Sequence, residues 1–351
     1  MEAVIKAHPG KGFEYSVDFP EPEIGPGDAL IKISAASICG SDRELFEWTP
    51  MAQAMGPRLP LVVGHECSGV VAGVGNGVRD LKVGQRVALE SHIFCGGCGR
   101  CRRGDGHMCD HLGVLGFTHD GGFAEYACVP CLTCVCLPDG ISDEAGALLE
   151  PFGVAVHAMQ RASLGAIGGA TVLVNGCGPI GLFVIELAWL FGASVVVGLE
   201  PNPYRRGLAE ERGALTIDPT AGDPGGRCSE LALRRGGFDI AFEVSGVDGM
   251  VPFLLKMLRP EGMAVTVGHP SSATAIDIAQ YINKRGVILK GVFGRRIWGS
   301  WELALDIILS GRIDPCRVVT HRLGLSDAEE AIDLLRTGAG KVILKPKSVS
   351  A

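Results

Sequence analysis

Up to about residue 150, short apolar runs alternate with clusters of glycine and proline. The runs at 29–33, 68–74 and 85–89 are rich in valine, isoleucine and alanine, and turn-forming residues separate them. Short strands with a turn signal roughly every ten residues are typical of a compact β domain. We therefore predict a β-rich first segment.

From about residue 154 the pattern changes to apolar strands that alternate with amphipathic helices. This alternation is typical of a parallel sheet with crossover helices, and it predicts the α/β fold class. The predicted strands lie at 171–175, 194–199, 238–244 and 264–268, with helices that begin at Pro179 and Pro203 and one that ends at Leu258.

After about residue 294 the chain resembles its first segment more than its second in the pattern of apolar and polar residues. We predict helices at 301–309 and 327–335, a short strand at 318–320 and a last strand at 341–345.

Composition narrows the function classes. The chain has 351 residues, of which 20% are charged, and its net charge is −7. An acidic balance argues against nucleic-acid and anionic-membrane partners. The N-terminus lacks the charged and apolar regions of a signal peptide, and the longest apolar run, 180–189, is too short to span a bilayer. We expect a cytoplasmic protein with reduced cysteines.

A ladder of four cysteines suggests a first metal site. The ladder consists of Cys95, Cys98, Cys101 and Cys109. In a reducing compartment this spacing indicates metal rather than disulfides, and four thiolates suit a closed, tetrahedral, structural zinc site.

A second cysteine run alternates with apolar residues and lacks a glycine-rich loop on which four sulfurs could converge. We expect strand there, with the thiols acting as small apolar side chains. The run consists of Cys128, Cys131, Cys134 and Cys136.

A glycine motif predicts a dinucleotide site. Residues 176–181 read G-x-G-x-x-G, follow a predicted strand and open a predicted helix. Gly176 permits the tight turn, Gly178 lets the backbone approach a pyrophosphate, and Gly181 permits close packing of helix on strand. Pro179 and Ile180 complete the motif.

The second predicted strand of this segment ends near Glu200, about 20 residues past the motif, where a ribose-binding acid belongs. A carboxylate there favours NAD over NADP. Arg205 and Arg206 follow closely and argue in the opposite direction, since arginine accommodates a 2′-phosphate.

Four further residues could form an open, catalytic zinc site. His65 and Glu66 follow an apolar run, Cys39 follows Ile38, and Glu150 precedes a proline near the change of texture. Cysteine, histidine and glutamate all bind zinc, and three such ligands plus water leave a position for substrate. Zinc there acts as a Lewis acid that lowers the pKa of an alcohol and favours hydride loss to a nicotinamide. Taken singly, each residue is ordinary.

In combination, these motifs resemble the zinc-dependent medium-chain dehydrogenase/reductase family over nearly the whole chain. The motifs at 39–42, 64–66, 95–109, 121–126 and 176–181 occur in the family's order. The resemblance implies a GroES-like catalytic domain built from residues 1–153 and 295–351, with a Rossmann NAD-binding domain at 154–294 between its parts. It also implies a homo-oligomer, either a tetramer or a dimer.

Within the family the sequence is most similar to the L-threonine 3-dehydrogenases, on the stretches 46–48, 62–66, 92–96, 151–157, 291–295, 319–322 and 340–344. The resemblance implies catalytic zinc at Cys39 and His65, with Glu66 and Glu150 as direct or exchanging ligands. It places a proton-relay hydroxyl at Ser41 and a substrate-adjacent histidine at His92.

The implied reaction is oxidation of a secondary alcohol by NAD, with the β-hydroxyl of L-threonine as the expected substrate. A polyol, amino-alcohol or modified-sugar dehydrogenase is the alternative on the same scaffold. A non-catalytic, quinone-reductase-like protein is the other class, but such relatives typically lack the zinc ligands Cys39, His65 and Glu66.

Two positions depart from the threonine dehydrogenase pattern. Ser41 replaces the usual threonine and keeps the hydroxyl. Glu44 stands where the family commonly has a histidine that ends the proton relay. A carboxylate accepts a proton at lower pH than an imidazole, so Glu44 is a candidate terminal base and also a reason to keep the substrate open.

Overall fold

The computed structural model describes residues 1–232 and 236–347, which fold into two compact units. Unit 1 comprises Met1–Pro151 and Arg296–Ala351, and unit 2 comprises Phe152–Arg295. Among the described residues, no helix combines the length and the apolar character that crossing a bilayer requires. All thirteen cysteines lie in the described ranges, and none of them forms a disulfide.

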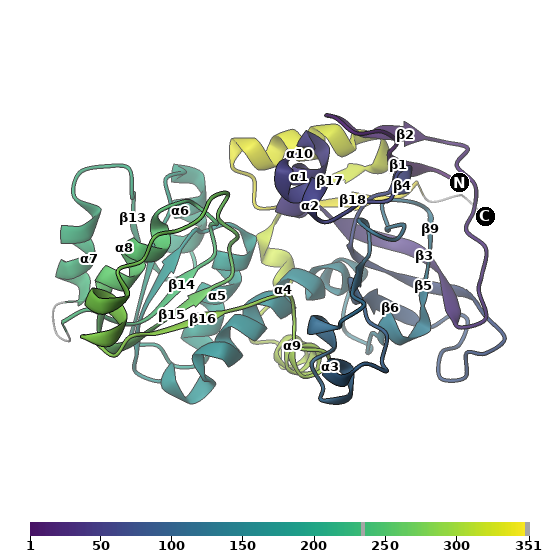
Figure 1. Ribbon diagram of the computed structural model, residues 1–351. Coiled ribbons are helices and arrows are strands. Elements are labelled where there is room, and N and C mark those ends of the chain that lie inside the picture. Colours follow the sequence, from purple (N-terminus) through teal and green to yellow (C-terminus); the bar gives the residue numbers. More distant parts are fainter. Residues whose placement is uncertain (233–235, 348–351) are drawn as a thin grey trace. The chain divides into compact units, whose positions relative to one another are not determined.

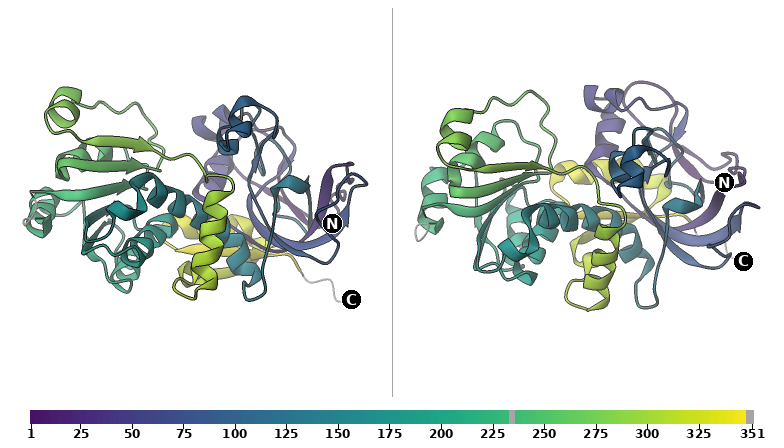
Figure 2. Two further views of the ribbon diagram at one scale, coloured as in Figure 1. Left: turned by 90° about the horizontal axis from the view of Figure 1, so that it is seen from below. Right: turned by 60° about the horizontal axis from the view of Figure 1, so that its bottom comes forward.

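Unit 1 is built around a seven-stranded sheet in the order β10-β6-β5-β3-β18-β17, with β9 also paired to β3. The C-terminal strand β18 pairs antiparallel with β3, so residues late in the chain complete the sheet of the first segment. In Figure 2 these late strands are yellow and lie beside the purple and blue early ones. Smaller sheets pair β2-β1-β4 and β7-β8.

The strands of unit 1 are β1 (Ala3–Lys6), β2 (Glu14–Ser16), β3 (Asp28–Ser37), β4 (Leu61–Val62), β5 (Glu66–Val74), β6 (Arg86–Leu89), β7 (His92–Ile93), β8 (Gly113–Val114), β9 (Tyr126–Pro130), β10 (Cys134–Cys136), β17 (Val319–Gly324) and β18 (Lys341–Lys345). Its helices are α1 (Gly40–Glu47), α2 (Pro50–Ala54), α3 (Gly99–Arg102), α9 (Gly299–Leu309) and α10 (Ala328–Thr337). Helix α4 (Asp143–Ala162) contains the boundary between the units.

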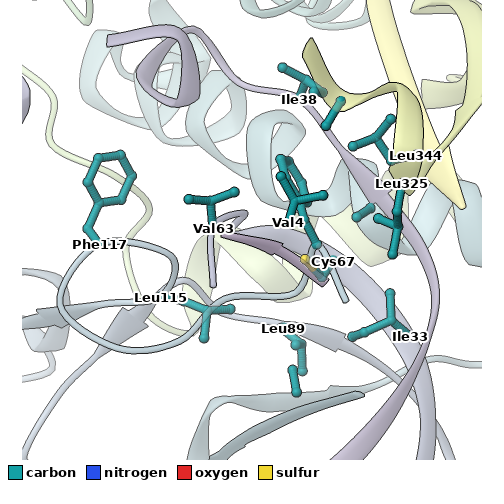
Figure 3. Close-up of a cluster of buried hydrophobic side chains, with 14 of the residues drawn as sticks. Val4, Ile33, Ile38, Val63, Cys67, Leu89, Leu115, Phe117, Leu325 and Leu344 are labelled. Carbon is teal, nitrogen blue, oxygen red and sulfur yellow. The ribbon is translucent and has the colours of Figure 1, made fainter. Parts of the chain in front are cut away.

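The core of unit 1 contains residues that are close in sequence to the candidate metal ligands. Figure 3 shows Ile38, Val63 and Cys67 pointing into one apolar cluster with residues of β18 and the loop at Phe117. Ile38 precedes Cys39, and Val63 and Cys67 flank the segment that contains His65. Burial of these neighbours anchors the backbone that carries the candidate metal ligands.

Unit 2 contains a six-stranded parallel sheet in the order β13-β12-β11-β14-β15-β16, flanked by helices (Figure 1). Counted from β11 this is the doubly wound order 3-2-1-4-5-6, whose ligand site lies where the order reverses, between β11 and β14. Every residue of β11 is buried, as expected for a parallel strand covered on both faces.

The strands of unit 2 are β11 (Thr171–Asn175), β12 (Val195–Leu199), β13 (Leu215–Ile217), β14 (Phe238–Glu243), β15 (Leu258–Thr266) and β16 (Ile288–Gly291). Its helices are α5 (Pro179–Leu190), α6 (Pro203–Glu210), α7 (Pro224–Ala232) and α8 (Met250–Met257).

The start of β15 differs from the sequence prediction. We expected the strand to begin at residue 264, but it begins at Leu258, directly after α8. Leu258 is fully buried and pairs with Phe238, and the register with β14 shifts before Ile240. Pro260 and Gly262 lie between Leu258 and Met263, in the irregular part of the strand where the register with β14 has no partner, so their loop-like signal coincides with this irregularity.

Candidate metal and dinucleotide sites

Three of the predicted zinc ligands converge at the end of β3. Cys39 follows β3 by two residues, and His65 and Glu66 lie where β5 begins. Because Ser37 pairs with Glu66 across the two strands, the segments are held side by side. The ligand atoms of Cys39, His65 and Glu66 all lie within 4.8 Å of one another.

A glycine allows the chain to turn into this site. Gly64 has a φ of 94°, in the left-handed region that favours glycine. A Cβ atom at Gly64 would lie 2.1 Å from the ring of Phe123, which is fully buried. A larger residue would therefore be strained in its backbone and would displace the core beside His65.

Asp42 orients both Cys39 and His65. Its Oδ2 accepts a 2.8 Å hydrogen bond from the Cys39 backbone N–H, and its Oδ1 lies 3.3 Å from His65 Nδ1. Burial is the largest single influence and would lower the pKa of His65, but the charge and hydrogen bond of Asp42, together with Cys39, hold this pKa well above its usual value. With Nδ1 turned toward Asp42, Nε2 is the nitrogen that would face a metal, which is the usual carboxylate–histidine–zinc arrangement.

Glu66 is also held by a buried cation. Lys341 Nζ lies 2.7 Å from Glu66 Oε1 and 2.5 Å from Oε2, and Ser37 donates a hydrogen bond to the same carboxylate. Burial disfavours the charge of Lys341, but the charge of Glu66 raises its pKa above the usual value. As a zinc ligand, Glu66 would share its oxygens with this lysine.

Glu150 lies on α4, and its Oε1 accepts a 2.8 Å hydrogen bond from Ser91 Oγ. Its charge acts on both Glu66 and Lys341, which places it beside the same cluster. Glu150 is not part of the group in which the ligand atoms of Cys39, His65 and Glu66 lie within 4.8 Å of one another. A thiolate, an imidazole and two carboxylates form a donor set that zinc prefers, so the residues present fit the metal.

The two predicted relay residues lie on α1. Ser41 Oγ is 3.4 Å from His65 Nε2, so its hydroxyl lies beside the position that a metal would take. Glu44 Oε2 accepts a 2.8 Å hydrogen bond from Thr49, and Glu44 Oε1 accepts one of 3.1 Å from Arg43. The Glu44 carboxylate therefore has one partner within α1, Arg43, and one between α1 and α2, Thr49.

His92 begins β7 and is 6% exposed. Its ring Nδ1 lies 2.8 Å from Glu90 Oε1, which also accepts the His92 backbone N–H at 2.8 Å. Ser91, between these two residues, bonds to Glu150. A short chain of contacts thus connects His92 to the surroundings of the candidate catalytic metal.

The four ladder cysteines also converge, with all four sulfurs within 4.8 Å of one another. Backbone N–H groups point at the sulfurs, including that of Cys95 toward Cys109 and that of Cys98 toward Cys95, both at 3.3 Å. Hydrogen bonds from the backbone of Asp110 and Cys101 lower the pKa of Cys98 to about 6. Such donors favour thiolates, so this lobe also fits zinc.

The second cysteine run does not form a comparable group within the described ranges. Cys128 lies in β9, Cys131 begins a 3-10 turn, and Cys134 and Cys136 lie in β10. Burial raises the pKa of Cys134 to about 12, as expected for a thiol that serves as an apolar side chain.

In unit 2, the glycine motif occupies the turn between β11 and α5. Gly176 has a φ of 94°, and a Cβ atom on Gly181 would lie 1.9 Å from the Gly176 carbonyl oxygen. A Cβ atom on Gly178 would meet no other atom within 4 Å. Gly178 caps α5, and Pro179 is its first residue. The turn therefore offers open backbone at a helix N-terminus, where a pyrophosphate binds. Ile180 lies in the first turn of the helix.

Glu200 follows β12 and is 5% exposed. Its Oε2 accepts the backbone N–H of Cys177 at 2.9 Å, so the carboxylate is tied to the glycine turn. Arg206 Nη1 donates to the Glu200 carbonyl and to Asp218 Oδ2, at 2.8 and 3.1 Å. These contacts hold the Arg206 side chain at the end of β12. Arg205 lies in the first turn of α6 and donates its backbone N–H to Asn202.

Sequence reasoning missed the residues that hold the ligands in place. Asp42 belongs to a motif that the sequence already singles out. Lys341 opens an apolar strand, an unusual position for a lysine, and Glu90 stands two residues before His92. These are faint signals, and only the fold shows that Trp301, at the start of α9, donates to Glu90.

Comparisons with known proteins agree with this arrangement. Residues 25–139 match the alcohol dehydrogenase GroES-like domain, and residues 179–310 match the zinc-binding dehydrogenase family. An L-threonine 3-dehydrogenase from Shewanella woodyi is 37% identical over 346 residues, covering 98% of this chain and 99% of the relative.

Two solved structures are also similar to the chain. A (2R,3R)-butanediol dehydrogenase from Bacillus subtilis is 31% identical with a TM-score of 0.87, covering 99% of each chain. A zinc-binding dehydrogenase from Sinorhizobium meliloti, bound to NADP, is also 31% identical, with a TM-score of 0.85 and coverage of 98% and 99%. The chain therefore belongs to the zinc-dependent medium-chain dehydrogenase/reductase family, as an alcohol dehydrogenase that uses zinc and NAD.

Proposed function

We propose that the enzyme oxidises the β-hydroxyl of L-threonine with NAD and forms 2-amino-3-ketobutyrate. The observation that carries the proposal is the placement of His92. This residue is buried and held by Glu90, and Ser91 connects its strand to Glu150 beside the metal ligands. The similarity to L-threonine 3-dehydrogenases over nearly the whole chain supports the same substrate.

Each residue then has a defined task. Cys39 and His65 would hold zinc, and Glu66 or Glu150 would complete or exchange in the ligand set. When bound, zinc supplies Lewis acidity and NAD accepts the hydride. Ser41, whose Oγ lies 3.4 Å from His65 Nε2, would take the proton of the substrate hydroxyl. The proposed exit for that proton is Glu44 on the same helix.

The dinucleotide would be bound by unit 2. The N-terminus of α5 would hold the pyrophosphate at Gly176, Gly178 and Gly181. Glu200 would accept hydrogen bonds from the adenosine ribose, which favours NAD because a carboxylate repels a 2′-phosphate. Arg205 stays a candidate contact to that end of the cofactor.

A polyol or diol is the second candidate substrate. The butanediol dehydrogenase at 31% identity supports it, as does Glu44, which departs from the threonine dehydrogenase pattern. In this family a few side chains around a common metal site decide which alcohol is accepted.

A screen of NADH formation tests the proposal. Wild-type enzyme is assayed with L-threonine, L-serine, sorbitol, inositols and 2,3-butanediol, with D-threonine as a stereochemical control. We expect L-threonine to give the highest kcat/KM, and dialysis against a strong chelator to abolish turnover until zinc is restored. Clear turnover of a polyol or diol without turnover of L-threonine would overturn the substrate assignment.

The relay is tested separately with Glu44→Gln. If Glu44 is the terminal base, the amide cannot accept the proton, and the pH–rate profile changes on its acidic side. An unchanged profile would remove Glu44 from the relay and leave the substrate proposal intact.

A further inference from the structure

Glu90 is a buried carboxylate that accepts hydrogen bonds from His92 and from Trp301. It is 1% exposed. Its Oε1 accepts both the backbone N–H and the ring Nδ1–H of His92, each at 2.8 Å. Its Oε2 accepts the indole N–H of Trp301 at 2.5 Å.

This geometry assigns the proton on the imidazole. A carboxylate accepts hydrogen bonds and donates none, so the His92 Nδ1 that faces it carries the hydrogen. Any contact between His92 and a substrate therefore has to use Nε2. Glu90 Oε1 accepts one hydrogen bond from the ring of His92 and one from its backbone, and together these two bonds fix the tilt of the ring.

Trp301 fixes the carboxylate in turn. It is 1% exposed and lies on α9, 211 residues from Glu90 in the sequence. An indole N–H is a donor only, so it favours an ionised acceptor at Oε2 and leaves Oε1 to His92. Near the start of α9, Trp298 packs edge-on against Phe94, with ring centroids 5.9 Å apart. The start of α9 is thus tied to the strand that carries His92.

We propose that Glu90 is a positioning residue that fixes the tautomer and orientation of His92, and that Trp301 holds Glu90 for this task. The inference rests on the proposed role of His92 at the substrate and goes beyond it. It makes substrate selection depend on a contact from the C-terminal part of unit 1. It also predicts that these three residues act as one unit and not as independent contributors.

A double-mutant cycle tests this unit. The variants are Glu90→Gln, His92→Ala and the combination of both, assayed with the alcohol that the wild type oxidises best. Gln keeps the shape of Glu90, but its amide nitrogen is a donor, and three N–H groups already point at this side chain. We expect Glu90→Gln alone to lower kcat/KM about 10–100-fold, by analogy with the loss of the carboxylate partner of a metal-bound histidine. In the His92→Ala background the same change should have an effect of less than about twofold.

If the effects of the two substitutions instead multiply, Glu90 acts independently of His92 and the proposal is overturned. Trp301→Phe can replace Glu90→Gln in a second cycle with His92→Ala. This second cycle tests the proposal if Glu90→Gln does not fold. Removing one hydrogen bond should lower kcat/KM about fivefold in the wild type and have no effect in His92→Ala.

Glu2→Gln is the matched control. Glu2 is also a buried carboxylate, and it accepts hydrogen bonds from an aromatic side chain, Tyr15, and from the backbone N–H of Lys347. It precedes β1 in a different sheet. Glu2→Gln should cost stability but leave kcat/KM unchanged, which separates general destabilisation from loss of positioning.

A spectroscopic measurement separates failure of this inference from failure of the proposed function. Nitrogen-15 NMR of the imidazoles, with His92 assigned from the His92→Ala spectrum, should show the proton on Nδ1 in the wild type and a changed tautomer balance in Glu90→Gln. This result does not depend on which alcohol is oxidised. An unchanged tautomer would overturn the role of Glu90, whereas a failed L-threonine assay alone would overturn only the substrate.

Discussion

The two candidate zinc sites of unit 1 are built in opposite ways. The cysteine lobe takes its four ligands from one stretch, Cys95 to Cys109, and local backbone N–H groups stabilise its sulfurs. The other site draws Cys39 from the end of β3 and His65 and Glu66 from the start of β5. Its surroundings contain Asp42, Glu150 and Lys341, the last of these 275 residues from Glu66.

This difference is the one expected between a structural zinc site and a catalytic one. A closed set of four thiolates can form wherever its own loop folds, and it needs few partners. A site with buried carboxylates needs neighbours that compensate their charge, because an isolated buried charge is costly. Those neighbours also orient the ligands and tune their basicity, which catalysis requires and simple bracing of a loop does not.

The largest expected effect is loss of turnover in Cys39→Ser. Removing one ligand of the proposed catalytic metal should lower kcat at least about 10³-fold, since a Lewis-acid metal lowers the barrier by several kcal/mol. The bound zinc should fall from about two ions to about one per chain. Activity and metal content measured on the same sample check this, with Cys316→Ser, a partly buried thiol outside both groups, as control. Wild-type activity in Cys39→Ser would show that the two sites are assigned wrongly.

Next in size is the effect of Lys341→Met on stability. The substitution leaves Glu66 buried without its cation, which should cost about 3–5 kcal/mol in the free energy of unfolding. Urea denaturation followed by fluorescence measures it. Lys345→Met is the matched control on the same strand, since Lys345 is half exposed and pairs with Glu144 at the surface. Its loss should cost less than about 1 kcal/mol. Equal losses of stability in the two variants would show that the buried Glu66 depends on its cation no more than the surface pair of Glu144 and Lys345 does.

A smaller loss is expected for Cys98→Ser, and it should be a loss of a different kind. The variant should lose the zinc of the lobe and at least about 2 kcal/mol of stability, while the folded fraction keeps most of its kcat. Thermal melting and metal content, compared with kcat below the melting range, check this. If kcat fell as far as in Cys39→Ser, the lobe would have a direct part in the chemistry.

The smallest effect concerns pH and a surface ion-pair network away from both metals. Hydrogen bonds from Arg322 and Lys345 lower the pKa of Glu144 to about 2. A carboxyl with a lowered folded-state pKa stabilises the fold above its unfolded value of about 4.5, and this contribution is lost as pH falls toward about 2. We expect about 1 kcal/mol after solvent screening.

Glu144→Gln should therefore be less stable than the wild type near pH 6 and equal to it near pH 2. Denaturation midpoints of both proteins across this range provide the measurement. A constant difference at all pH values would mean that the network contributes through packing and not through charge.

Local signals were readable from the sequence, and long-range partnerships were not. Strand β11 and strand β18 have the predicted bounds, because an apolar run between turn signals determines each of them. The cysteine ladder and the glycine turn are equally local. The partners of Glu66 and Glu90, in contrast, are Lys341 and Trp301, which only the pairing of β18 with β3 and the placement of α9 bring close. No periodicity encodes such a contact.

The pairing of β18 with β3 also sets an order of events during synthesis. Cys39, His65 and Glu66 leave the ribosome early, but Lys341 follows only after all of unit 2 has been made. Until β18 has been made, Glu66 lacks Lys341 as its buried cation, while the cysteine lobe has all its ligands by residue 109. The lobe thus has its whole ligand set while the rest of the chain is still being made, and the candidate catalytic site reaches its final charge balance only once the last strand is in place.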